Sequence, residues 1–98
     1  MDINSIPELF QSRIRLAIIS TLILGDNTFN QIKEITQATD GNLSLHLTKL
    51  EEAGCIKSEK EFIGKKPRTT YSLTKNGRKE FEDYVEFLEQ ILKQGSAK

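Results

Sequence analysis

The sequence predicts an α+β fold, mainly α, with a helix-turn-helix, a two-stranded β-hairpin, and long N- and C-terminal helices. Three observations support this prediction. Apolar residues recur at helical spacing in four segments, and capping residues mark where these segments begin. Between residues 55 and 73 the composition changes to that of strands. Because 98 residues suffice for one modest core, we expect a single domain over residues 1–98.

The first predicted helix covers residues 11–24, and its apolar residues occupy much more than one stripe. The preceding stretch Ser5–Glu8 has the pattern of a helix start, with a capping serine, an early proline and an acid. A helix that is apolar nearly all round is buried on most sides. A domain of this size offers little cover, so we expect a second chain to cover this helix, with Ile14 and Ile18 at the interface.

A short second helix is predicted over residues 28–38, after turn residues 25–27. Thr28 and Gln31 form a capping-box pattern at its start. We expect Phe29, Ile32 and Ile35 on its inward side. A short break then leads into the next helix, so two short helices are separated by a tight turn, which is the helix-turn-helix arrangement.

The third predicted helix covers residues 40–53. Asp40 is the expected cap, with Thr39 as the alternative, and Gly54 suits the left-handed position after the helix end. Leucines at i, i+4 and i+7 form its inward stripe. Short polar side chains let an outward helix face approach base edges in a DNA major groove. The outward face holds Gly41, Ser44, Leu45, Thr48 and Lys49, with Asn42 and His46 at its flank.

A β-hairpin is predicted over residues 55–73, where β-branched and aromatic residues gather. Alternation places Tyr71 and Leu73 on the core side, whereas the register of the first strand stays open. The connection at residues 64–68 makes the tip of the hairpin basic, through Lys65, Lys66 and Arg68.

The last predicted helix covers residues 74–93, with Thr74 as its cap. Its apolar stripe is too long for so small a domain to cover, and exposed apolar patches of this kind indicate a partner. Two-fold homodimers are the commonest solution. We therefore expect a homodimer in which this helix contributes Phe81, Tyr84, Leu88 and Ile91 to the interface.

Net charge is zero, but the charges are segregated along the chain. Residues 41–79 hold nine basic and four acidic side chains, a net charge of +5, whereas residues 1–40 carry −2 and residues 80–98 carry −3. A positive segment of this kind suits contact with a polyanion. The alternative is a solvated face with chance segregation, and charge alone does not decide between them.

Several classes of function lack the residues they need. No apolar run is long enough to span a bilayer, no signal peptide is visible, and Cys55 has no second cysteine to pair with. We expect a cytoplasmic protein with no membrane partner. One cysteine and one histidine do not close a metal site, and neither a glycine-rich phosphate loop nor a catalytic triad is present. We expect no enzyme activity, no metal and no cofactor.

Two runs of sequence resemble one known family. The run LSLHLTKLEEAG at residues 43–54, followed by PRTTYSLTKNGR at residues 67–78, resembles the winged-helix transcriptional regulators, in particular the small single-domain group related to MarR and ArsR. The resemblance covers roughly residues 13–92. It implies a recognition helix in the major groove, a hairpin wing on adjacent backbone or minor groove, and dimerisation through the terminal helices. The DNA contacts it implies are Asn42, Ser44, Leu45, His46, Thr48 and Lys49 in the recognition helix and Lys65, Lys66 and Arg68 in the wing.

Leu45 departs from the family pattern, which often has arginine at this position. Leucine can make only apolar contact, for instance with a thymine methyl group, which favours A·T-rich sites. Two hypotheses follow. The first is a homodimeric, sequence-selective regulator of double-stranded DNA, acting as a repressor by occluding a promoter. The alternative, suggested by net neutrality and Leu45, is a winged-helix protein–protein interaction module with only weak, non-specific DNA binding. The sequence names no effector, operator or regulated gene.

Overall fold

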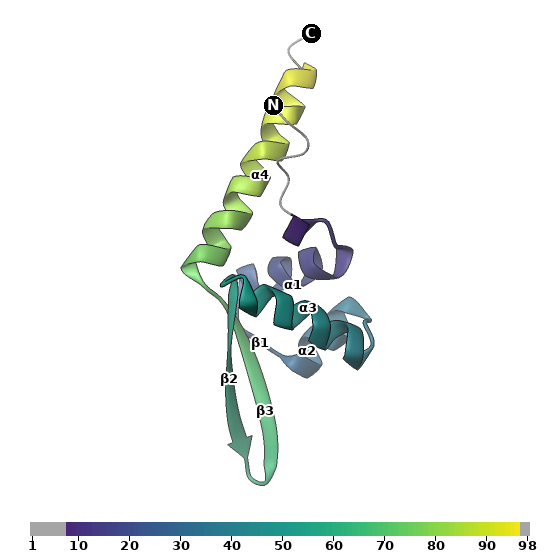
Figure 1. Cartoon of the computed structure of the whole chain (residues 1–98), viewed down its shortest axis with the longest axis vertical. Helices are drawn as coiled ribbons and strands as arrows, with labels where there is room; N and C mark the ends of the chain where they lie inside the picture. The colour runs from purple at the N-terminus through teal and green to yellow at the C-terminus, as the bar shows by residue number, and fades with distance from the viewer. Residues whose placement is uncertain (1–7, 97–98) are drawn as a thin grey trace.

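The computed structural model describes residues 8–96 as four α-helices and a three-stranded antiparallel sheet (Figure 1). The predicted fold class is confirmed. In chain order, the elements are the 3₁₀ turn η2 (Glu8–Phe10), α1 (Arg13–Leu24), β1 (Asn27–Thr28), α2 (Phe29–Thr36), α3 (Asp40–Glu52), β2 (Ile56–Ile63), β3 (Lys66–Leu73) and α4 (Lys75–Ser96).

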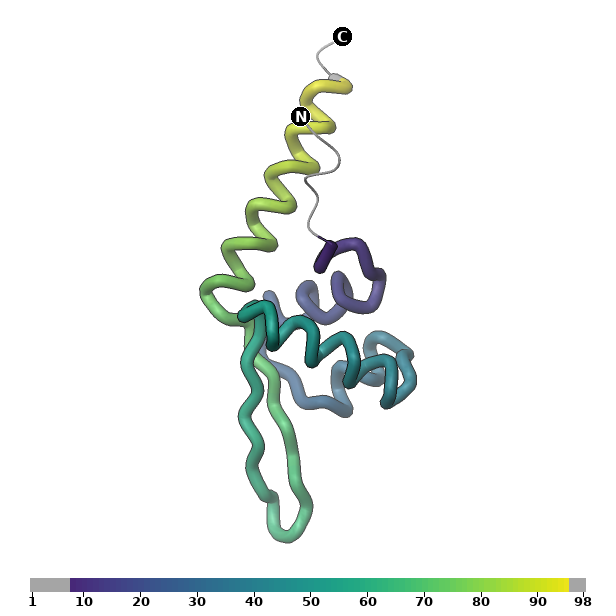
Figure 2. The backbone as a smooth tube through the Cα atoms, viewed as in Figure 1, coloured from purple at the N-terminus to yellow at the C-terminus, as the bar shows by residue number. Residues whose placement is uncertain are grey.

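The molecule is elongated, with principal extents of 61 × 25 × 21 Å. Helices α1, α2 and α3 form a small body, from which the β2–β3 hairpin and α4 project in opposite directions (Figures 1 and 2). The predicted start at Ser5 lies outside the described residues. Helix α1 begins at Arg13 rather than at residue 11, because the Ser12 hydroxyl accepts from the backbone N–H of Arg15 at 3.3 Å and caps it.

Capping explains the starts of α2 and α3. The Thr28 hydroxyl accepts from the Gln31 N–H at 3.2 Å, and the Gln31 side chain accepts from the Thr28 N–H at 2.9 Å, which confirms the predicted capping box. At α3 the cap is Thr39, the alternative in the prediction, whose hydroxyl accepts from the backbone N–H of residue 42 at 3.2 Å. Asp40 is instead the first helical residue and forms an ion pair with Lys33 at 2.6 Å.

The sheet has one strand more than the sequence predicts. The two-residue strand β1 pairs with β3 and so attaches the α1–α2 connection to the hairpin. The hairpin turn is also tighter than expected, because Ile63 pairs directly with Lys66 and only Gly64 and Lys65 form the turn. Gly64 has a φ of 65°, which glycine adopts without strain. Lys66 and Arg68 therefore belong to β3 rather than to a loop.

The core is formed by the inward faces of α1 and α3 together with residues of η2, α2 and the sheet. Its buried apolar members are Phe10, Ile18, Ile19, Leu22, Ile32, Leu43, Leu47, Leu50, Cys55, Ile56 and Tyr71. The leucine stripe of α3 is thus inward, as predicted. Ile18 is 0% exposed within a single chain, so its predicted place at a dimer interface is wrong. Ile35 is 56% exposed, so its predicted inward position is also wrong.

A tight junction fixes the point at which α4 leaves the body. Thr74 caps α4 by accepting from the Gly77 N–H at 2.9 Å, and its hydroxyl lies 2.6 Å from the carbonyl oxygen of Gly54, to which it donates. The Thr74 N–H donates to the Cys55 carbonyl at 3.0 Å. Gly77 packs so closely on this strand end that a Cβ atom there would lie 2.0 Å from the Cys55 carbonyl oxygen. Gly54 has a φ of 77°, the left-handed conformation predicted for it.

Candidate nucleic-acid interface

The outward face of α3 is polar and exposed. Leu43, Leu47 and Leu50 anchor the opposite face in the core, and this burial fixes how the helix is rotated. The residues left exposed are Gly41, Asn42, Ser44, Leu45, Thr48 and Lys49, and His46 is partly buried at the flank. Leu45 is 52% exposed, an apolar side chain in a polar surface. The arrangement offers short donors and acceptors, one apolar contact and one cation to a partner.

Arg15 of α1 lies beneath this surface, and the sequence patterns did not point to it. It is 7% exposed, and its guanidinium donates to the carbonyl oxygens of Leu9 at 2.8 Å and Glu8 at 3.2 Å. Its Nη1 lies 3.2 Å from Nδ1 of His46. Burial, followed by the nearby charges of Arg15 and Lys49, lowers the pKa of His46 below its usual value, so the imidazole is neutral near pH 7.

A signal for Arg15 was present in the sequence. It is the last charged residue before the apolar run that fills the rest of α1. A charged side chain on a helix that is apolar nearly all round must find partners inside the protein. The sequence could therefore have indicated a buried hydrogen-bonding role for Arg15, although not the identity of His46 as a partner.

The cations of the hairpin are not equivalent. Lys65 and Lys66 are exposed at the tip, and neither forms an ion pair with any residue in the range 8–96. Arg68 is opposite Glu61 in the β2–β3 register, and its Nε and Nη2 donate to one carboxylate oxygen of Glu61 at 3.0 and 2.5 Å. The sequence predicts a basic tip formed by Lys65, Lys66 and Arg68; among residues 8–96 the structure leaves the two lysines without an ion pair and pairs Arg68 with Glu61.

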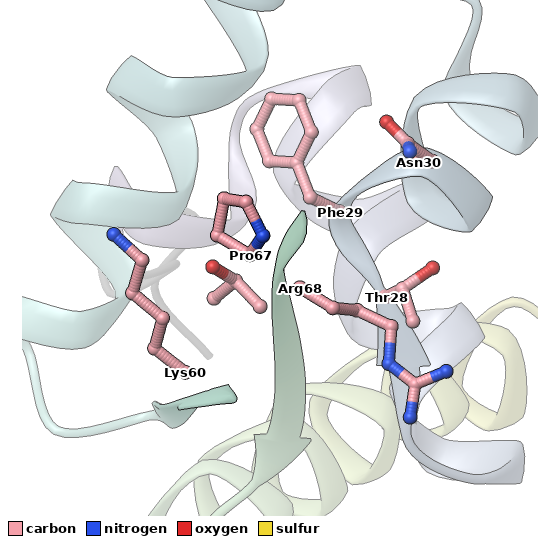
Figure 3. Close-up of a pocket in the computed structure, with 7 residues that line it drawn as sticks. Thr28, Phe29, Asn30, Lys60, Pro67 and Arg68 are labelled. Atoms are coloured by element: carbon pink, nitrogen blue, oxygen red, sulfur yellow. The ribbon is translucent and has the colours of Figure 1, made fainter. Parts of the chain in front are cut away.

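A hollow of about 300 Å³ lies between the hairpin and the start of α2 (Figure 3). Figure 3 shows Lys60 and Arg68 on opposite sides of the β3 ribbon, with Thr28 and Asn30 on the α2 side. The sequence analysis did not identify Lys60 as a candidate contact, because it left the register of this strand undecided. Pairing with Thr69 now places it on the hairpin face that turns toward the helices. Lys60 thus adds an exposed cation between the wing tip and the body.

The order and geometry of these elements match one family of known domains. A family model described as a winged helix DNA-binding domain matches residues 14–92. The chain belongs to the winged-helix DNA-binding domain family. This class is non-enzymatic, and the predicted resemblance is confirmed.

Relatives of this winged helix come from archaea and bacteria. An uncharacterized protein of Methanocaldococcus jannaschii is 37% identical over 87 residues, which covers 88% of this chain and 95% of the relative. The solved transcriptional regulator homologue from Pyrococcus horikoshii is 30% identical with a TM-score of 0.74, over 89% of this chain and 92% of that one. Two further structures share the fold at lower identity.

The first of these is a MarR-family regulator from Enterococcus faecalis, 20% identical with a TM-score of 0.78, over 97% of this chain and 88% of that one. The second is PadR of Bacillus subtilis, solved in complex with operator DNA. PadR is 24% identical with a TM-score of 0.64, over 70% of this chain and 44% of its own. These two likenesses show that the chain shares its fold with a MarR-family regulator and with PadR.

Helix α4 of this winged helix divides into two parts. Phe81 and Tyr84 are partly buried against Phe10, with ring centroids 6.0 and 5.1 Å from that ring, so much of their surface is covered within the chain. Ile14 is likewise partly buried against the core. Toward its C-terminal end the helix projects away from the body (Figure 2). Beyond Tyr84, Phe87 is still partly buried, whereas Val85 (36%), Leu88 (38%), Ile91 (37%) and Leu92 (71%) are exposed.

Other site classes find little support in the part of the chain that the structure describes. Residues 8–96 contain no group of three or more His, Cys, Asp or Glu side chains placed to hold a metal ion. Cys55 is a buried free thiol, and burial, with Glu80 nearby, raises its pKa. None of the helices within residues 8–96 combines the length and apolar character needed to cross a bilayer.

Proposed function

We propose that this winged helix is a homodimeric, sequence-selective regulator of double-stranded DNA in the cytoplasm, and that it represses transcription by occluding a promoter. The observation that carries the proposal is the exposed polar face of α3, held outward by three buried leucines. The family supplies DNA as the partner class, and the fold neighbour PadR was solved with operator DNA.

In this proposal α3 enters the major groove. The base edges and nearby phosphates are contacted by Asn42, Ser44, Leu45, His46, Thr48 and Lys49. Leu45 contributes apolar contact with a thymine methyl group, so the preferred half-site contains A·T pairs. Lys65 and Lys66 contact the phosphate backbone or the adjacent minor groove, and Arg68 joins them when its bond to Glu61 is exchanged for phosphate.

The dimer follows from the exposed apolar stripe of α4. Four apolar side chains exposed over two helical turns suit a symmetric partner, which would bury the same stripe on both chains. We place Leu88 and Ile91 at this interface, with the exposed edges of Ile14, Phe81 and Tyr84 beside them. A two-fold pair would present its two α3 helices to major grooves about 34 Å apart, so the operator would be a pseudo-palindrome.

Selection of bound duplexes from a random pool tests sequence selectivity. The expected result is enrichment of a pseudo-palindrome whose half-sites contain A·T pairs. A pool that stays random, with weak binding, contradicts the proposal and favours the alternative of a protein–protein interaction module. The net charge of zero and the apolar side chain of Leu45 are the two observations that favour this alternative.

The wing contacts are tested by the salt dependence of binding. Replacing Lys65 and Lys66 with alanine should lower the slope of log K against log salt by about 0.9 for each phosphate that the variant no longer neutralises. Lys93→Ala, in the last turn of α4 and remote from the hairpin, is the matched control and should leave the slope unchanged. An unchanged slope in the hairpin variant would remove the wing from the phosphate backbone.

Sedimentation tests the dimer. We expect a species of twice the chain mass of 11.1 kDa at micromolar concentration. Leu88→Lys with Ile91→Lys should yield a monomer that binds DNA much more weakly, because one chain then contacts a single half-site. Glu86→Lys, on the opposite side of α4, controls for added positive charge. A wild-type protein that sediments as a monomer excludes the dimer but leaves DNA binding open.

A further inference from the structure

Arg15 and His46 form a contact between α1 and the flank of the recognition helix. The two side chains are separated by 31 positions in sequence, and Arg15 Nη1 lies 3.2 Å from His46 Nδ1. Arg15 is itself held by the carbonyl oxygens of Glu8 and Leu9, so its guanidinium has little freedom to move. The arginine is therefore a fixed reference against which the imidazole is oriented.

The chemistry of this contact determines which imidazole nitrogen carries the proton. A guanidinium has only donors, so a hydrogen bond to Nδ1 requires Nδ1 to be the unprotonated acceptor. The neutral imidazole then carries its proton on Nε2. Burial and the cations Arg15 and Lys49, the charged groups that act on this ring from α1 and α3, favour the neutral form.

The Nε2–H group is available to an external partner. His46 makes no hydrogen bond through Nε2 within residues 8–96, and no buried side-chain nitrogen in that range lacks a partner, so Nε2 is reached by solvent. Asn42, His46 and Lys49 follow the i, i+4, i+7 spacing and line one edge of the exposed face. A donor at His46 therefore lies between two side chains of the proposed DNA surface.

We propose that Arg15 is a positioning residue that holds His46 as the Nε2–H tautomer, so that the recognition helix presents a donor-only group to a hydrogen-bond acceptor on DNA. The proposal rests on the proposed DNA-binding function. Without Arg15, the imidazole would be free to present either a donor or an acceptor. With it, His46 selects acceptors, which are N7, O6 or O4 atoms on base edges in the major groove or phosphate oxygens.

The tautomer can be read directly, because His46 is the only histidine in the chain. Nitrogen-15 NMR of the full-length protein near pH 7 should show an acceptor-type Nδ1 and a protonated Nε2. Arg15→Met, which keeps the apolar stem and removes the donors, should shift Nδ1 toward the value of a tautomer mixture. A protonated Nδ1 in the wild-type protein overturns the proposal, and this measurement stands even if the Arg15 variant fails to fold.

Two variants of His46 separate the donor from the contact with Arg15. The amide nitrogen of His46→Gln can take the place of Nε2–H, whereas the oxygen of His46→Asn can accept from Arg15 without reaching the DNA. On the duplex selected by the wild-type protein, we expect His46→Gln to bind within about threefold and His46→Asn about tenfold more weakly, the size of one missing hydrogen bond. Equal affinity of His46→Asn and wild type would overturn the proposal.

The pattern of weakened binding identifies the acceptor. Weakening confined to one base position indicates a base edge, and uniform weakening across sequences indicates a phosphate oxygen; both support the proposal. Failure of the proposed role of Arg15 and His46 can be distinguished from failure of the proposed DNA-binding function. If the wild-type protein selects no duplex, the regulator proposal fails and so does the role of His46 on DNA. If it selects a duplex that the His46 variants bind equally well, only the present inference fails.

Discussion

The contact between α4 and the end of α3 predicts that Gly77→Ala will destabilise the protein, although alanine is the better helix former. A Cβ at this position would lie 2.0 Å from the Cys55 carbonyl oxygen, 2.8 Å from its carbonyl carbon and 2.9 Å from Leu73 Cδ1. Two of the three neighbours are backbone atoms, so the clash cannot be relieved by rotating a side chain. Helix α4 would have to move away from the sheet.

The size of the effect follows from two opposing terms. Alanine favours the helix over glycine by up to about 1 kcal/mol. Overpacking in a rigid site costs roughly 1–3 kcal/mol and sometimes more, and an overlap with backbone belongs at or above the upper end of this range. The expected net loss is about 2 kcal/mol, or a fall in melting temperature on the order of 10 °C for a domain of this size.

Gly95→Ala is the matched control, because it lies in the same helix and its added Cβ would have nothing within 4 Å. It should leave stability unchanged or raise it slightly. Thermal unfolding of both variants and wild type should be followed by circular dichroism at one fixed protein concentration, since dimerisation would make melting concentration-dependent. If Gly77→Ala melts at or above the wild-type temperature, the close approach of α4 to Cys55 is refuted.

Three further predictions concern the hairpin, the core and pH. Glu61→Gln removes the ion pair that Arg68 gives up when it binds phosphate, so titration should show tighter DNA binding with the slope of log affinity against log salt unchanged, because the number of phosphate contacts is the same; unchanged affinity would mean that Arg68 stays off the DNA. Phe10→Ala empties the space against the rings of α4 and should cost about 3–5 kcal/mol in urea unfolding; a smaller loss would mean that the site collapses. Folding lowers the pKa of His46, so the neutral imidazole contributes its full stabilisation above the ordinary pKa of 6.5 and this contribution is lost as the pH falls below that value. The free energy of unfolding of wild type and His46→Gln, measured at several pH values, should therefore converge as the pH is lowered.

Much of the fold could be predicted because its signals are local. The capping box at Thr28, the left-handed Gly54 and the leucine stripe of α3 each depend on residues within a few positions of one another, and each is confirmed. The exposed face of α3 follows from that stripe alone. Thr39 and Asp40 were both plausible caps; Thr39 is the cap, and Asp40 pairs with Lys33 in the last turn of α2, a contact that the local pattern did not indicate.

The features that sequence reasoning missed depend on distant partners. Strand β1 has only two residues and exists because β3 offers it an edge more than 40 positions later in the chain. Ile18 was predicted at a dimer interface because the spacing of apolar residues along the sequence does not reveal that α3 and the sheet pack on α1 and bury it. Arg68 became paired with Glu61 once the hairpin register was set, and Arg15 found His46 across the body.

The junction at Thr74 and Gly77 has a mechanical consequence. Strand β3 runs into α4 with a single residue between them, and hydrogen bonds from that residue to Gly54 and Cys55 fix the directions of the hairpin and of α4 relative to each other. In a paired molecule, any change in the angle at which the two α4 helices cross would swing both hairpin tips. A small molecule wedged between those helices would thereby alter the spacing of the tips without touching the surface that reads the operator.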